Sequence, residues 1–239
     1  MRSMLTGIGA MGLFMLICGS ADAASLRVAP TNLEMVAPGS ASVLTLTNEA
    51  KRPINVQIRV FRWTQTNGVE QLEPTNDVVV SPPSTVLSGN KDYLVRVIRV
   101  SKKPVVREES YRVIVDELPD PARRKSGTVA LVVRYSIPVF FKEPDASAPK
   151  VTWTLKRVNG SLVLAARNNG DSRLRLSDLQ LTQGGRDVGT RKGLVGYVLG
   201  GASMQWPVGS GRSVSGGSVA LKAQSDSGPL DVNVAVNDR

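Results

Sequence analysis

The segment that most strongly constrains the architecture is Thr128-Val129-Ala130-Leu131-Val132-Val133-Arg134-Tyr135-Ser136-Ile137-Pro138-Val139-Phe140-Phe141. It predicts one long β-strand with apolar residues on both faces and a basic residue in the middle. A strand in a half-solvated sheet alternates apolar and polar residues, and this segment does not. Its second face must therefore be covered, either by a second layer of the same protein or by a partner.

Almost every other periodic segment is also strand-like. Ile54, Val56, Ile58 and Val60 alternate with polar residues, which is the period of a half-buried strand. Short turns rich in Asn, Gly and Pro separate roughly seven such strands before residue 142, and no segment has the pattern of an amphipathic helix. The pattern is typical of an immunoglobulin-like β-sandwich, so we expect an all-β fold.

The polar, Pro-rich stretch 143–149 predicts a linker between two domains. A second set of strand-like segments follows it, with Asn-Gly hairpin signals such as Asn159-Gly160. We therefore predict a signal peptide over 1–23, an N-terminal immunoglobulin-like domain over 24–142, and a C-terminal β-sandwich domain over 150–239.

The N-terminus has the features of an export signal. Arg2 is followed by an uncharged, mostly apolar run from Met4 to Cys18, and Ala21-Asp22-Ala23 fits a small-x-small cleavage site. The apolar run is shorter than the about 20 residues that a membrane span needs, which argues against an uncleaved anchor. Cys18 is the only cysteine and leaves with the signal, so the mature chain forms no disulfide.

The composition excludes several classes of enzyme. The chain has no histidine, which removes the usual general base and the commonest transition-metal ligand. With no mature cysteine either, the Ser-His-Asp and Cys-His types of catalysis are excluded, and we expect no metal or cofactor. The formal charge of +10 is scattered along the strands, so we expect no nucleic-acid partner and attribute it to solubility and to acidic partners.

Four motifs of the first domain together resemble the periplasmic chaperones of the chaperone–usher pilus pathway, the family typified by the P-pilus chaperone. Their order and spacing carry the resemblance, and the second half fits by size and strand content. The motifs are Val28-Ala29-Pro30-Thr31-Asn32-Leu33-Glu34, Leu44-Thr45-Leu46-Thr47-Asn48 with a following strand that ends in Phe61-Arg62-Trp63, Tyr111-Arg112-Val113-Ile114-Val115-Asp116-Glu117-Leu118-Pro119, and the strand from Ala130 to Phe141.

The resemblance implies two immunoglobulin-like domains joined at an angle and a chaperone that lends its last first-domain strand to an incomplete pilus subunit. Such a strand pairs with the subunit's open sheet edge, while alternate side chains fill its core. On this interpretation Val129, Leu131 and Val133, continued by Tyr135, face the subunit. Val132 and its neighbours of the same parity pack inward, and a slip of one residue would exchange the two sets.

The family also anchors the subunit's C-terminal carboxylate with an Arg on the first strand and a Lys near the end of the last first-domain strand. Here Asn32 stands at the Arg position and Pro138 near the Lys position. The resemblance therefore leaves Arg134 as the first candidate anchor, Arg96 as the second, and Asn32 as a neutral donor. For each Arg, the alternative is a solvated strand face.

The resemblance further implies a periplasmic location, pilus subunits and an outer-membrane usher as partners, and no stable membrane insertion. The short loop over 120–127, with no cysteine in the mature chain, resembles the short-loop branch of the family and not the long-loop, disulfide-bearing branch. The motif sequences, especially Arg134-Tyr135-Ser136-Ile137-Pro138-Val139-Phe140, are most similar to the archaic, spore-coat-like chaperones. The alternative is an exported structural β-sandwich protein, such as a pilus subunit or an adhesin. Two domains without a donor extension or a cysteine argue against it.

Overall fold

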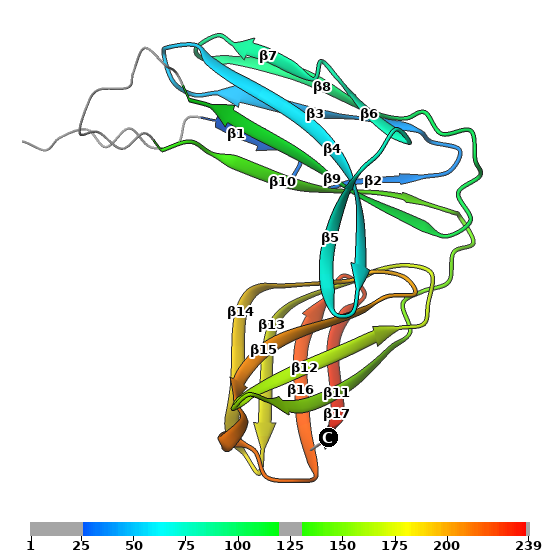
Figure 1. The fold of residues 1–239 in the computed structure, drawn as a ribbon, viewed down its shortest axis with the longest axis vertical. Helices are drawn as coiled ribbons and strands as arrows, with labels where there is room; N and C mark the ends of the chain where they lie inside the picture. The colour runs from blue at the N-terminus through cyan, green and yellow to red at the C-terminus, as the bar shows by residue number, and fades with distance from the viewer. Residues whose placement is uncertain (1–25, 120–130, 238–239) are drawn as a thin grey trace, which may run out of the picture.

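The computed structural model describes residues 26–119 and 131–237, and these residues form two β-structured domains set at an angle (Figure 1). Regular structure in them is almost entirely strand, with one short 3-10 turn, η2 (Gly211–Ser213). No helix in these two ranges is long and apolar enough to cross a membrane. The expected all-β, two-domain class is therefore confirmed; the exact domain boundaries remain a prediction.

The first domain is a sandwich of two sheets. One sheet has the order β1-β3-β8-β6, made of β1 (Leu26–Ala29), β3 (Ala41–Asn48), β8 (Lys91–Arg99) and β6 (Val78–Ser81). The other has the order β2-β10-β9-β4-β5, with β7 also paired to β4, made of β2 (Leu33–Val36), β10 (Arg134–Lys142), β9 (Glu108–Leu118), β4 (Ile54–Thr66), β5 (Val69–Pro74) and β7 (Ser84–Leu87).

Alternate residues of the two sheets meet in the first core. Leu44 and Leu46 from β3 and Val113 and Val115 from β9 have no exposed surface, as the period of two requires when one face of each strand is inward. A fully buried Val or Leu stabilises the fold by about 1.5–3 kcal/mol relative to an exposed one. The first domain therefore has a core of its own.

The second domain is one sheet rolled upon itself. Its order is β14-β13-β16-β17-β11-β12-β15, made of β11 (Val151–Val158), β12 (Ser161–Asn168), β13 (Leu174–Gln183), β14 (Arg186–Val198), β15 (Ser203–Ser210), β16 (Ser218–Ser225) and β17 (Gly228–Asn237). The two ends of this order approach each other, because a Cβ at Gly189 would lie 2.4 Å from the Val208 carbonyl oxygen. Leu155, Leu164 and Leu221 fill the interior.

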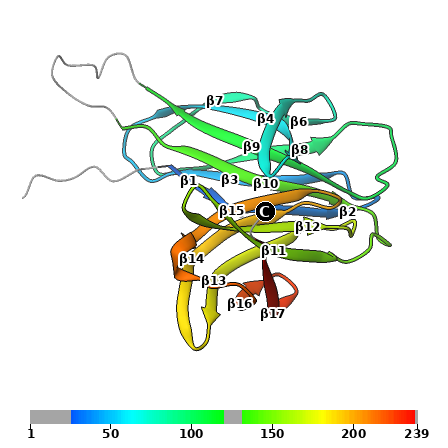
Figure 2. The same ribbon diagram turned by 60° about the horizontal axis from the view of Figure 1, so that its bottom comes forward.

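The predicted Asn159-Gly160 turn is present, and a second Asn-Gly pair forms a similar turn. Asn159 and Gly160 join β11 to β12 with φ of 49° and 78°, and Asn67 and Gly68 join β4 to β5 with φ of 55° and 79°. Both pairs lie in the left-handed region that a two-residue hairpin turn needs. The second turn is the tip of the β4–β5 hairpin, which reaches the second domain (Figure 1). Figure 2 views the same two domains with the second domain brought forward.

A small aromatic cluster lies where the domains meet. Trp63 and Phe140 come from the first domain, and Tyr197 and Leu199 come from the second; all four are buried. The Trp63 and Tyr197 rings are perpendicular with centroids 5.3 Å apart, an arrangement that aromatic pairs prefer. This cluster fixes the floor of the space between the domains.

Candidate functional site: an open sheet edge that leads into a cleft

The strand β10 is paired along only part of one side. Its antiparallel partner β9 covers it from Arg134 to Lys142, whereas its parallel partner β2 covers the other side only from Val139 to Lys142. Within the described residues, Arg134–Pro138 therefore has no strand beside it on that second side. We call this segment the open edge.

The backbone direction of each residue on the open edge follows from two hydrogen bonds. Glu117 donates its N–H to the Val133 carbonyl at 2.9 Å on the β9 side, and Ala37 donates to the Lys142 carbonyl at 2.9 Å on the β2 side. In an antiparallel pair, residues alternate between those bonded to the partner and those facing away. Residues 135 and 137 therefore bond to β9, whereas Arg134 and Ser136 present free N–H and C=O groups.

Pro138 ends the run of donors. It belongs to the even-numbered set that faces the open edge, but proline has no N–H. The strand β2 begins to pair at the next residue, Val139. The open edge thus offers donors at Arg134 and Ser136, offers acceptors as far as Pro138, and stops where β2 takes over.

The side chains of β10 divide between two faces. Tyr135, Ile137, Val139 and Phe141 pack on the first-domain core, and the Tyr135 hydroxyl donates a hydrogen bond to the Leu26 carbonyl. The even-numbered residues face the opposite way, toward the second domain. The expectation that the even-numbered set packs inward is thus wrong for this strand, because odd-numbered residues fill the core.

A cavity of about 420 Å³ lies between the domains at the end of the open edge. Both domains contribute polar and charged side chains to it, which makes it a cleft suited to a charged group. Its lining residues are Thr31, Asn32, Glu34, Arg112, Ser136 and Pro138 from the first domain, and Arg173, Arg175, Leu194, Tyr197 and Asp226 from the second.

Arg112 on β9 is a buried cation of the cleft that has no close carboxylate partner, in contrast to Arg173. Its guanidinium lies flat on the Trp63 ring, 3.7 Å from the centroid, and 13% of its side chain is exposed. The nearest carboxylate oxygen belongs to Glu70 at 3.9 Å. Burial lowers the pKa of Arg112 and Glu70 raises it, so an added anion would relieve the cost of holding this charge out of water.

Arg173, immediately before β13, is shared between two carboxylates. Its guanidinium stacks on Phe140 at 3.6 Å, pairs with Glu108 at 2.5 Å and also pairs with Glu34. Its Nε is buried and has no hydrogen-bond partner among the described residues. Burial raises the pKa of Glu108, although Arg173 opposes this effect. Arg173 therefore ties the second domain to the first, with both of its strong partners supplied by the first domain.

The residues before β10 are exposed. Leu131 is 90% exposed and Val132 48% exposed, and Val133 is partly buried. Regular strand begins at Arg134 in the described part of the chain, later than the sequence predicts, and Val129 lies outside the described residues. The expected inward packing of Val132 is not observed, whereas the exposure of Leu131 leaves its proposed role as a donor residue open.

The three candidate anchors lie in different places. The Arg134 side chain turns to Asp116, which also accepts from Arg59 at 2.7 Å. Arg96 lies on the other sheet of the first domain, opposite Val43, and does not line the cleft. Asn32 does line the cleft, and its amide donates to Glu34 at 2.9 Å.

The sequence interpretation missed Arg112, Arg173 and Arg175. Arg112 stands in the quoted Tyr111 motif, at a position that alternation assigns to a solvated face. The second domain covers that face, and no sequence periodicity reports such an inter-domain contact. A basic residue flanked by core residues on a strand next to the open edge was the one available signal.

Comparison with known proteins now gives the family. Residues 25–147 match the family described as "Pili and flagellar-assembly chaperone, PapD N-terminal domain". The chain belongs to this chaperone family. No curated protein sequence is similar enough to be matched.

Solved structures of pilus chaperones share the fold over both domains. A chain in the CsuC–CsuE chaperone–tip adhesion subunit pre-assembly complex, from the archaic Csu pili of Acinetobacter baumannii, is 24% identical with a TM-score of 0.68, and the match covers 90% of this chain and 100% of that one. The E. coli chaperone DraB is 26% identical with a TM-score of 0.58 and coverages of 87% and 98%. A chain in the complex of the Salmonella enterica SafA pilin with the SafB chaperone is 19% identical with a TM-score of 0.61, and the match covers 89% of this chain and 98% of that one.

Proposed function

We propose that this pilus chaperone captures incomplete subunits by pairing its open edge, extended toward Leu131, with the subunit's own unpaired strand. The single observation that carries this proposal is the unpaired side of β10 from Arg134 to Pro138. An exposed row of N–H and C=O groups is a template for another strand and is normally covered or blunted in a free-standing protein. Here it is kept open beside exposed apolar residues.

The side chains before the open edge would supply the apolar part of the contact. If β10 continues regularly, Val133 and Leu131 project on the side of Tyr135, where they extend the first-domain core. A client core completed there would bury them together with Val129. Each such side chain contributes about 1.5–3 kcal/mol on burial, before the cost of association is subtracted.

The cleft would receive the C-terminal carboxylate of the subunit. Arg112 is the preferred anchor in this proposal, because it is held rigidly by Trp63 and lacks a close carboxylate. Arg173 and Arg175 line the same cavity, and Asn32 adds a neutral donor. A carboxylate at the end of the open edge would make charge-assisted hydrogen bonds, which are about twice as strong as neutral ones.

The other parts of the proposal follow from the sequence and the family. The export signal over 1–23 and the cleavage after Ala23 support a periplasmic chaperone, and delivery to an outer-membrane usher completes its role. The family consists of chaperones rather than enzymes, and we propose that this chain likewise has no catalytic activity. The archaic, spore-coat-like branch remains the subgroup we favour, with pilus subunits as clients.

The test replaces Leu131 by Asp and identifies by mass spectrometry what co-purifies from the periplasm. We expect the wild-type chain to carry a small β-rich subunit at one-to-one stoichiometry and Leu131→Asp to carry none. Val106→Asp is the matched control, since Val106 is 75% exposed on the same domain and away from the open edge. Equal recovery of the subunit with both variants would contradict the donor role of this segment.

A further inference from the structure

The β4–β5 hairpin leaves the first domain and reaches the second. The strand β4 pairs with β9 as far as Arg62, and beyond that residue β5 is its only ladder partner among the described strands. Figure 1 shows the hairpin projecting from the upper sheet down to the second domain. At its tip, Gly68 forms a parallel bridge with Met204 of β15. A first-domain element thus touches the second domain far from the linker.

Gln65 near the tip makes a double hydrogen bond across the domain boundary. Its Nε2 donates to the Tyr197 carbonyl at 2.8 Å, and its Oε1 accepts from the Leu199 N–H at 2.9 Å. Gln65 is 8% exposed. The Gln65 side-chain amide therefore donates one hydrogen bond to the second-domain backbone and accepts another from it. A peptide group of a neighbouring strand would bond to this backbone in the same way.

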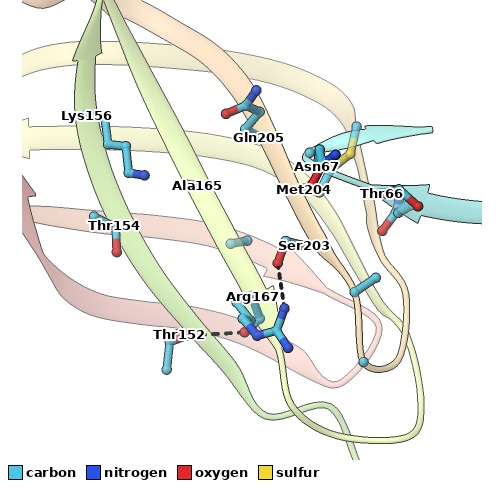
Figure 3. A pocket seen from close by; sticks show the side chains of 15 residues that line it. Thr66, Asn67, Thr152, Thr154, Lys156, Ala165, Arg167, Ser203, Met204 and Gln205 are labelled. Carbon is cyan, nitrogen blue, oxygen red and sulfur yellow. Dashed lines mark hydrogen bonds between the residues drawn. The ribbon is translucent and has the colours of Figure 1, made fainter. Parts of the chain in front are cut away.

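The surroundings of the tip leave few other ties. Beside it lies an open polar cavity of about 500 Å³, which Thr152, Lys156 and Arg167 line from the second domain and Thr66 and Asn67 line from the tip (Figure 3). The tip approaches β15 closely at Gly68, where a Cβ would lie 2.8 Å from the Gln205 Cγ. Together with the Gly68–Met204 bridge, the two hydrogen bonds of the Gln65 amide are the directional contacts that hold the tip on the second domain.

The backbone segment that bonds to Gln65 includes Tyr197, whose ring lines the cleft. The Tyr197 ring contacts Trp63 edge-on, lies 5.7 Å from the Arg112 guanidinium and lines the cleft. We propose that Gln65 is a positioning residue, which locks the β4–β5 hairpin to the second domain and thereby fixes the opening of the cleft and the orientation of Arg112. The hairpin is then a strut between the domains. The consequence for subunit capture rests on the proposed function, but the strut itself does not.

The Gln65 amide satisfies two backbone groups of the second domain, the Tyr197 carbonyl and the Leu199 N–H. In Gln65→Leu the side chain keeps a similar volume, but the Tyr197 carbonyl and the Leu199 N–H lose their partner inside a packed interface. Buried polar groups without partners are unfavourable enough to drive a rearrangement toward water. We expect this rearrangement to be a withdrawal of the hairpin from the second domain, because the cavity beside the tip is already open to solvent.

The test measures the distance between the domains without any client. Cys18 is the only cysteine, so in a Cys18→Ser background two spin labels can be placed at Lys91→Cys and Ser218→Cys, which are exposed positions of β8 and β16. Pulsed electron spin resonance should show a narrow distance distribution for the parent. Gln65→Leu should about double its width, because the Arg173 ion pairs and the aromatic cluster still join the domains but the hairpin no longer restrains their relative motion.

The matched control is Gln71→Leu, the same change at an exposed position of the same hairpin. It should leave the distribution unchanged. A second variant, Gln65→Glu, keeps the size and places a carboxylate against the Tyr197 carbonyl, so it should broaden the distribution even if Gln65→Leu folds poorly. A narrow, unshifted distribution in either folded Gln65 variant would overturn the strut.

A second readout tests the link to the cleft. With the subunit that co-purifies with the wild-type chain as probe, Gln65→Leu should dissociate about ten-fold faster, with the unfolding of the first domain unchanged. Unchanged dissociation despite a broadened distribution would refute the link and leave the strut. If the wild-type chain captures no subunit, the proposed function fails, and the distance measurement still decides the role of Gln65.

Discussion

Removal of the Arg112 charge is the most discriminating perturbation of the cleft. Arg112→Met keeps an unbranched, apolar side chain beside the Trp63 ring, somewhat shorter than Arg, and eliminates the cation. The variant should therefore preserve most of the packing at the domain boundary, because Met adapts to irregular apolar surroundings and contacts aromatic rings favourably. What it loses is the charge-assisted hydrogen bonding to a subunit carboxylate.

The size of the loss follows from the setting of Arg112. Only 13% of the side chain is exposed and the nearest carboxylate oxygen is 3.9 Å away, so neither solvent nor an internal partner screens much of the interaction. Hydrogen bonds to charged groups contribute about 1.5–3 kcal/mol net. We therefore expect subunit affinity to fall about ten- to one-hundred-fold in Arg112→Met.

The assay follows association and dissociation of the co-purifying subunit on an immobilised chaperone. Arg134→Met and Arg96→Met are run beside Arg112→Met, because the sequence favours these two positions as anchors. Arg134 is neutralised by Asp116, and Arg96 lies away from the cleft. Both controls should change the affinity less than about three-fold, as is typical of exposed charges.

Two results would refute this reasoning. One is an Arg112→Met variant that unfolds like the parent and binds the subunit within two-fold of it. The other is a larger loss in Arg134→Met than in Arg112→Met, which would restore Arg134 as the anchor. A subunit with an amidated C-terminus adds a direct check, since Arg112→Met should not discriminate it from the free carboxylate.

Two further predictions concern carboxylates. Burial pushes the pKa of Asp116 up, but hydrogen bonds from Arg134 and Arg59 outweigh it and hold this pKa below its usual value; Asp116→Asn should lower the free energy of unfolding near pH 7 by about 1–3 kcal/mol. The stability difference between the parent and Asp116→Asn is fully present above the ordinary aspartate pKa, and it should shrink as pH falls through the depressed pKa of Asp116. The control is Asp231→Asn, at an exposed pair with Lys222 at 3.4 Å, which should change the free energy of unfolding by less than about 0.5 kcal/mol in urea titrations. A loss in Asp231→Asn as large as that in Asp116→Asn would contradict the stabilising role of Asp116. Glu34→Gln should release Arg173 and tighten subunit binding about two- to five-fold in the same kinetic assay. Glu49→Gln, which changes a glutamate of similar exposure that pairs with the exposed Arg27, should leave binding unchanged, and equal effects would remove Glu34 as a competitor.

Local sequence rules predict much of the fold. The alternation of Ile54, Val56 and Ile58 identifies β4, and the Asn-Gly pairs fix two hairpin turns, because side-chain period and left-handed backbone are properties of a few adjacent residues. The two-domain, all-β architecture follows from many such local signals in series. The residue at which β10 begins is less well predicted. Apolar residues occur on both faces of this segment, so it has no apolar–polar alternation from which the first strand residue could be located.

The faces of β10 illustrate what local rules cannot supply. With Val132, Val133 and Tyr135 all able to enter a core, the sequence does not distinguish the two parities. The structure resolves them through the packing of Ile137 and Val139 on the first core and through the contact of Tyr135 with Leu26. These contacts join residues far apart in the chain.

The cleft was harder still to predict. Arg112 and Arg173 come from different domains, and each lies flat on an aromatic ring of the first domain, Trp63 or Phe140. Neither stacking contact produces a periodic pattern in the sequence, so sequence rules interpret each of these arginines as an ordinary exposed residue. The departure from the family pattern expected at Asn32 and Pro138 predicts that the usual anchors are absent or displaced, but not which residues stand near their place.

The central claim is that a subunit strand pairs with the open edge of β10, and residue-resolved amide hydrogen exchange tests it most directly. In the free chaperone, Tyr135 and Ile137 should already exchange slowly, because their N–H groups bond to β9, whereas Arg134 and Ser136 should exchange fast. In the complex with the co-purifying subunit, Arg134 and Ser136 should become protected. Unchanged fast exchange at both residues in a stoichiometric complex would contradict strand pairing at this edge.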